Sequence, residues 1–109
     1  MFYEIRTYRP KNGVISDYLK VVGEEGIAIQ KRHLGNLVGD FSSEIGPINE
    51  IVHIWGFSSL DDRQARRARL GADPGWQAFL PKIRDLIVTA DTKIMMPAAF
   101  SPLGGTAPA

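Results

Sequence analysis

Apolar residues alternate with polar or small ones in four segments of the chain, and they recur every three or four residues in the segments between. Alternation is typical of strands, and the longer period is typical of helices that bury one face. The pattern predicts strands over residues 2–8, 37–45, 49–57 and 89–96. It predicts helices over residues 14–33, 60–70 and 74–87.

Capping residues and glycines indicate where these helices begin, break and end. Ser59 followed by Asp62 matches an N-terminal capping pattern, and Asp73 followed by a proline opens the next helix in the same way. Glycine weakens a helix, so we expect a kink or break near Gly26. Pro81 leaves two alternatives, which are one kinked helix or a short turn followed by a second start.

The resulting order is β-α-β-β-α-(α)-β. It predicts an α+β fold of the ferredoxin-like, split βαβ type, with a four-stranded antiparallel sheet and its helices on one face. Residues 1–100 form one domain in this prediction. Residues 101–109, rich in alanine, glycine and proline, are expected to be an extended or disordered tail.

Both sides of the strand at residues 49–57 call for burial. One row carries Ile51, His53, Trp55 and Phe57, and the other carries Val52 and Ile54. We expect the mostly aliphatic rows to face the helices; these comprise Tyr3, Ile5, Thr7, Val52, Ile54, Ile94 and Met96. The remaining rows are too aromatic for water and too charged for a plain core; these comprise Glu4, Arg6, Tyr8, Ile51, His53, Trp55, Phe57, Asp91, Lys93 and Met95. They predict a homodimer whose two sheets enclose a mixed polar and aromatic chamber.

Composition narrows the function classes. The chain has 109 residues and a net charge of +1. A net charge this small gives no overall electrostatic attraction to nucleic acid or an anionic membrane. The chain has no cysteine, and its two histidines make an all-histidine metal site within one chain unfavourable. No apolar run approaches the roughly 20 residues that a membrane span needs, and the N-terminus lacks an export signal. These features predict a cytoplasmic protein with no metal and no cofactor.

The chamber row supplies the candidate functional residues. His53 titrates near neutral pH and is predicted as a general base, and Arg6 as the group that holds an anionic oxygen. The alternative for His53 is an interface histidine bonded near the hairpin. The predicted substrate-binding residues are Glu4, Tyr8, Glu44, Asn49, Trp55 and Trp76. The arginine-rich helix from Arg63 to Arg69 is interpreted as a solvated, ion-paired face, because no aromatic residues are interleaved with its charges.

With these residues assembled, the chain resembles the NIPSNAP family of the dimeric α/β-barrel superfamily. The resemblance covers nearly all of residues 2–97. It rests on the segments Tyr3-Glu-Ile-Arg-Thr-Tyr8, Glu44-Ile-Gly-Pro-Ile-Asn49, His53-Ile-Trp55, Ser59-Leu-Asp-Asp-Arg63, Arg66-Arg-Ala68 and Asp73-Pro-Gly-Trp76. It implies a ferredoxin-like protomer that dimerises through its sheets, and it brings no settled reaction.

Three hypotheses of function remain open from the sequence. The first is a homodimer that binds a small organic molecule, aromatic or carbonyl-bearing, with proton transfer or cofactor-independent oxygenation as its chemistry. The second is a non-enzymatic interaction or scaffold module, in which the same residues join two protomers. The third is haem binding through His53, for which the sequence offers a lone imidazole.

Overall fold

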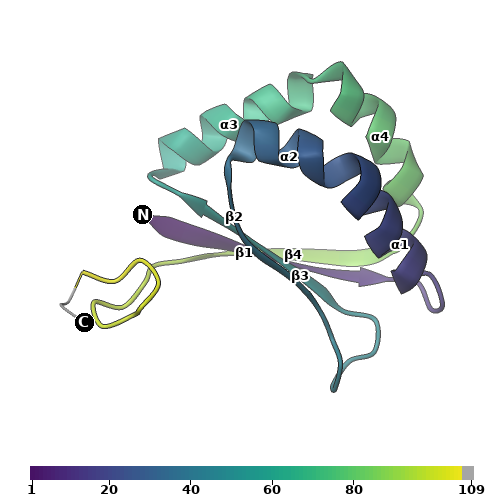
Figure 1. Cartoon of the computed structure of the whole chain (residues 1–109), viewed down its shortest axis with the longest axis horizontal. Helices are drawn as coiled ribbons and strands as arrows, with labels where there is room; N and C mark the ends of the chain where they lie inside the picture. The colour runs from purple at the N-terminus through teal and green to yellow at the C-terminus, as the bar shows by residue number, and fades with distance from the viewer. Residues whose placement is uncertain (107–109) are drawn as a thin grey trace.

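The computed structural model describes residues 1–106 and contains four strands, with the helical elements all lying on one side of the sheet (Figure 1). The predicted strands and helices are present, with ends that differ by a few residues. The strands are β1 (Phe2–Pro10), β2 (Asn36–Ser42), β3 (Ile51–Phe57) and β4 (Ile87–Met95). The helical elements are α1 (Ile15–Val21), a π-helical turn (Val22–Gly26), α2 (Ile27–Leu34), α3 (Leu60–Ala72) and α4 (Pro74–Arg84).

The sheet has the strand order β2-β3-β1-β4, and every neighbouring pair is antiparallel. This is the split βαβ order of a ferredoxin-like α+β fold, so the predicted fold class is confirmed. The two central strands pair in unbroken register, with Glu4 opposite Trp55 and Arg6 opposite His53. The polar residues of β1 are therefore held beside the imidazole of β3.

The local signals in the sequence account for the helix boundaries. The Ser59 hydroxyl accepts a hydrogen bond from the Asp62 amide at 2.9 Å, and the Asp73 carboxylate accepts one from the Gly75 amide at 2.7 Å. The break expected near Gly26 is the π-helical turn at Val22–Gly26. A Cβ at Gly26 would lie 2.6 Å from the Phe79 ring, so a side chain there is excluded by the close approach of α4. The helix α4 passes through Pro81 as a single element, which selects the first of the two alternatives.

The hydrophobic core lies between the helices and the sheet. One cluster joins Tyr18, Val22, Ile51, Phe79 and Ile83, and a second joins Leu34, Trp55, Phe57 and Leu70. Glu4 is fully buried on the same side of the sheet, and His53 is buried with it. The helices thus cover the row of Glu4, Arg6, Ile51, His53, Trp55 and Phe57.

The predicted assignment of the two sheet faces is therefore wrong for β1 and β3. The row with His53 packs under the helices instead of lining a chamber between two sheets. The physical reason is that the helices supply polar partners for it: Tyr18 from α1 bonds His53, and Arg63 from α3 bonds Glu4. The assignment holds for β4. Ile94 lies on the helix side, opposite Glu4, and is 40% exposed at the sheet edge, while Asp91, Lys93 and Met95 lie on the open side, opposite Thr7, Ile5 and Tyr3.

The opposite face of the sheet has no helix over it (Figure 1). It carries Ile5, Val52 and Ile54, which are half-buried, and Phe41 and Met95, which are 59% and 49% exposed. At one end of this face the segment after β4 turns back over Tyr3, with hydrogen bonds from Ser101 and Gly105 closing its turns. The rest of the predicted tail, residues 107–109, lies outside the described residues. In residues 1–106, no helix combines the length and the apolar character that crossing a membrane demands.

Candidate functional site

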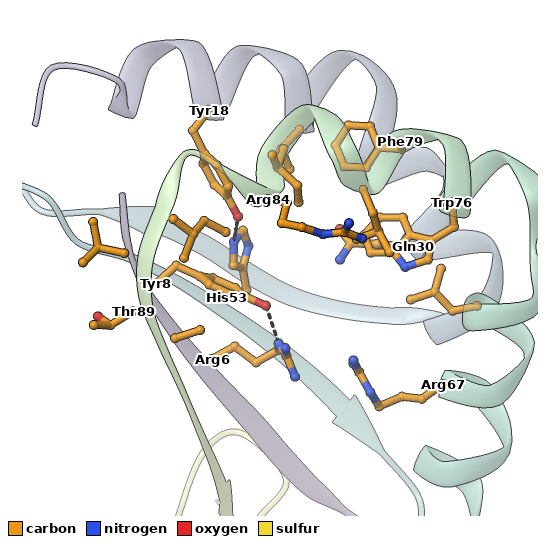
Figure 2. Close-up of a pocket in the computed structure, with 17 residues that line it drawn as sticks. Arg6, Tyr8, Tyr18, Gln30, His53, Arg67, Trp76, Phe79, Arg84 and Thr89 are labelled. Carbon is orange, nitrogen blue, oxygen red and sulfur yellow. Dashed lines mark hydrogen bonds between the residues drawn. The ribbon is translucent and has the colours of Figure 1, made fainter. Parts of the chain in front are cut away.

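A cavity of about 510 Å³ lies between the helices and the sheet, on the side that carries His53 (Figure 2). Its floor comes from β1, β3 and the start of β4, and its walls come from α1, α2, α3 and α4. Its volume is in the range of small-molecule sites. Its polar lining includes Arg6, Tyr8, Tyr18, His53, Arg67 and Arg84.

Both ring nitrogens of His53 contact protein groups, although Nδ1 makes no hydrogen bond within the described residues. The Tyr18 hydroxyl lies 3.1 Å from Nε2, and the Asp40 carboxylate lies against Nδ1. A carboxylate accepts and does not donate, so Nδ1 carries the proton and Nε2 accepts from the Tyr18 hydroxyl. Burial lowers the pKa of His53 to about 4, and the Arg6 guanidinium adds to that shift. Burial raises the pKa of Tyr18, so its phenol stays protonated. Together they form a chain of carboxylate, neutral imidazole and phenol.

A β-bulge places Asp40 in this chain. Leu37 pairs with Trp55, but Gly39 pairs with Ile54, so the register shifts by one residue between them. Beyond the bulge, Asp40 lies opposite His53 and shares its face of the sheet. Without the extra residue, Asp40 would project from the open face.

Three arginines bring positive charge to the cavity. Arg6 comes from β1, Arg67 from α3 and Arg84 from α4, and no aspartate or glutamate of residues 1–106 lines the cavity. Figure 2 shows Arg6 and Arg67 reaching the same end of the cavity from the sheet and from the helix. Arginine keeps its charge in this setting and offers a planar fork of donors that suits a carboxylate.

The negative charge next to Arg6 and Arg67 is Glu4 of β1. Its carboxylate accepts a hydrogen bond from Arg63 Nε at 2.7 Å, and its other oxygen lies 3.6 Å from Arg6 and 3.7 Å from Arg67. That other oxygen makes no hydrogen bond within the described residues. Three guanidinium groups thus share one carboxylate, and the site keeps an excess of positive charge.

Aromatic side chains complete the cavity. Arg6 Nε donates to the Tyr8 hydroxyl at 2.8 Å, and the Tyr8 ring meets the His53 ring edge-on, with 5.1 Å between centroids. On the helix side, Trp76 and Phe79 stack at 5.4 Å. The arrangement offers a positive end, an apolar wall and a phenol backed by a neutral base.

The predicted site residues divide into three groups. His53, Arg6, Tyr8 and Trp76 line the cavity. Glu4 and Trp55 are buried close by, Glu4 under the arginines and Trp55 in the core beside Leu70. Glu44 and Asn49 do not line the cavity: they lie in the loop between β2 and β3, where the Asn49 amide donates to Asn12.

Sequence reasoning missed Tyr18, Asp40, Arg67 and Arg84. Tyr18 lies at an apolar position of the predicted helix over residues 14–33, although its hydroxyl needs a partner when buried. Arg63 and Arg67 were assigned to a solvated face, which is wrong, because both contact Glu4. Their spacing of four residues, matched to a lone glutamate on a buried row, was the available signal. In residues 1–106, no three histidine, cysteine or acidic side chains are grouped to hold a metal ion.

Comparison with known proteins identifies the family. The NIPSNAP family model matches residues 3–102. A NipSnap homolog of Dictyostelium discoideum is 32% identical over 95 residues, which is 87% of this chain and 42% of that protein. The chain spans less than half the length of the curated relatives it matches.

Solved structures agree with this result. A crystal structure of a NIPSNAP family protein from Agrobacterium tumefaciens, described as having unknown function, is 77% identical with a TM-score of 0.92, and the match covers 94% of this chain and 93% of that one. An antibiotic biosynthesis monooxygenase has the same fold, with a TM-score of 0.64 at 15% identity over 90% of this chain and 99% of that one. The family model, the curated relatives and the solved structures all lead to the same conclusion, that the chain belongs to the NIPSNAP family.

Proposed function

We infer that the protein is a homodimer that binds a small organic anion with an aromatic or apolar body in the cavity between its helices and sheet, and that it moves a proton to or from that molecule. The observation that carries this proposal is the charge of the cavity. Arg6, Arg67 and Arg84 line it, and no acidic residue does. Arg6 and Arg67 are half-buried, whereas Arg84 is exposed. Half-buried guanidinium groups in excess over carboxylates favour an anionic ligand, because a ligand carboxylate supplies the missing counter-charge.

The remaining walls indicate the body of the ligand. Trp76, Phe79, Leu80 and Ile83 form an apolar side, and the Tyr8 and Tyr18 rings form another. An aromatic ring fits between such walls, since stacking and apolar burial both stabilise it. The neutral imidazole of His53 supplies the basic group for proton transfer near neutral pH.

Oxygenation is not part of this proposal. The solved structure with the monooxygenase title is 15% identical to this chain, and at that level the likeness concerns the fold. Proton transfer needs only residues that line the cavity.

Calorimetric titration with benzoate tests the binding proposal. Arg67→Gln removes one guanidinium of the cavity, and Arg69→Gln removes an exposed one from the same helix. A hydrogen bond to a charged group contributes about 1.5–3 kcal/mol, so Arg67→Gln should weaken binding by roughly tenfold to a hundredfold. Arg69→Gln should leave the affinity unchanged. If the wild type binds no benzoate, or if both variants bind it equally well, the cavity is not an anion site.

The homodimer is supported by the uncovered sheet face. A row of apolar residues there includes Phe41, which is 59% exposed. Sheet faces of this kind are stabilised when a second copy covers them. The matched pair Phe41→Asp and Leu60→Asp tests it, because Leu60 is 58% exposed but lies on α3. Analytical ultracentrifugation should find a dimer for wild type and Leu60→Asp and a monomer for Phe41→Asp. A monomeric wild type at micromolar concentration would contradict this part of the proposal.

A further inference from the structure

We propose that Tyr18 is the group that exchanges a proton with the ligand, and that the ligand carries a weakly acidic hydroxyl in addition to its carboxylate. This inference rests on the proposed binding of an organic anion in the cavity. It begins from the contacts of His53. Nε2 faces the Tyr18 hydroxyl, and Nδ1 faces Asp40, so the imidazole has no free nitrogen to offer a ligand. Figure 2 shows the Tyr18 hydroxyl pointing from α1 onto the imidazole.

The Tyr18 oxygen can accept a proton because its own proton has a destination. The hydroxyl donates to His53 Nε2, which leaves lone pairs on the oxygen for a ligand in the cavity. When the ligand hydroxyl gives its proton to the Tyr18 oxygen, the original Tyr18 proton passes to His53 Nε2. One O–H bond of the ligand breaks, one O–H bond of Tyr18 is exchanged, and one N–H bond forms. No oxidant or further reactant is needed.

Asp40 stabilises the product of this transfer. The imidazole becomes an imidazolium, and the adjacent carboxylate pairs with its charge. The positive charge of Arg6 on β1 disfavours the imidazolium. The other titratable side chains that face the imidazole are Tyr8, through its ring edge, and Tyr18, through its hydroxyl. Asp40 is therefore a positioning residue, whereas Tyr18 touches the ligand.

The spacing of the two ends of the site indicates the class of ligand. Tyr8 spans them: its hydroxyl bonds Arg6 Nε, and its ring packs on His53. The Tyr8 ring thus lies between Arg6 and His53, and its centroid is 6.4 Å from that of the Tyr18 ring. A hydroxybenzoate carries a carboxylate and a hydroxyl on one aromatic ring, and so supplies one group for the arginines and one for Tyr18.

The test uses 4-hydroxy-3-nitrobenzoate, whose phenol changes colour on ionisation, and 3-nitrobenzoate, which lacks the hydroxyl. The wild type should bind the first probe as the coloured phenolate at a pH where it is neutral in solution. Calorimetry in buffers of different ionisation enthalpy should show no matching proton release, because the proton stays on His53. Tyr18→Phe and Asp40→Asn should raise the apparent pKa of the bound phenol by roughly one unit or more, a tenfold loss of phenolate. They should bind 3-nitrobenzoate as the wild type does.

Tyr3→Phe is the matched control, since the Tyr3 ring is buried on the open face and does not line the cavity. Asp40→Asn keeps the test decisive if Tyr18→Phe does not fold. Equal colour and equal proton release in the wild type and either folded variant would overturn the role of Tyr18. Binding of 3-nitrobenzoate alone would overturn the ligand class while leaving the anion site intact. Failure of both probes would remove the proposed function, and this inference with it.

Discussion

Replacing Glu4 with glutamine removes the negative charge on which three arginines converge. Glu4 is fully buried, and the side chains of Arg6, Arg63 and Arg67 around it are 20%, 23% and 33% exposed. Glutamine has the same shape, so Glu4→Gln changes charge with little change in volume. The variant leaves three neighbouring guanidinium groups without their shared counter-charge.

The expected loss of stability follows from this burial. Removing one partner of a buried ion pair costs about 3–5 kcal/mol. Water still reaches part of each arginine, which places the cost for Glu4→Gln near the lower end, at about 3 kcal/mol. For a domain of this size the melting temperature should fall by roughly 10–25 °C. Glu24→Gln, at an exposed helical position, should stay within about 0.5 kcal/mol of the wild type.

Urea unfolding and thermal melts measure this difference directly. Sulfate should stabilise Glu4→Gln more than the wild type, because the uncompensated arginines bind an anion only in the folded state. Adding Arg63→Gln to Glu4→Gln should restore part of the lost stability, since it removes one of the unpaired charges. A Glu4→Gln protein as stable as Glu24→Gln, with no added response to sulfate, would refute the interpretation of Glu4 as the shared counter-charge.

Three further predictions concern helix packing, capping and pH. Gly26→Ala should destabilise the fold by about 1–3 kcal/mol, because its Cβ meets the Phe79 ring at 2.6 Å. Gly23→Ala, with open space around it, should be neutral or stabilising by up to about 1 kcal/mol. Chemical denaturation of the two variants measures this difference. Ser59→Ala should lose about 1 kcal/mol in the same measurement, because its hydroxyl caps α3. As pH falls from 6.5 towards 4, His53 takes up a proton in the unfolded state but not in the folded state. The free energy of unfolding should therefore drop by up to about 3 kcal/mol. A His53→Asn protein that shows the same drop would contradict this prediction.

The fold was predictable because each local signal agreed with the others. Alternating rows predicted the four strands, and Ser59 and Asp73 marked the starts of α3 and α4. The glycine near the middle of the first helical region marked the π-helical turn. Such signals depend on a few neighbouring residues, and tertiary contacts did not override them here. The resemblance to the NIPSNAP family is confirmed as well.

The sheet faces were not predictable in the same way. An aliphatic row and a polar aromatic row were both present, and the aliphatic one was matched to the helices. That choice rested on the aliphatic character of the row, and α3 was interpreted separately as a solvated, ion-paired helix. Arg63 and Arg67 instead turn inward to Glu4, so the helix provides the polar partners that the second row needs. When both rows of a strand suit burial, the polar partners on the helices decide which row faces them. The residue pattern of the strand alone does not reveal those partners.

The candidate site was predicted in part for a related reason. His53, Arg6 and Tyr8 follow from the composition of two adjacent strands, whereas Asp40 reaches His53 only because the bulge after Leu37 shifts the register by one residue. The bulge places a carboxylate behind the imidazole, in contact with Nδ1. The irregularity that conceals Asp40 from a period-two pattern is therefore the feature that completes the chain from Asp40 through His53 to Tyr18.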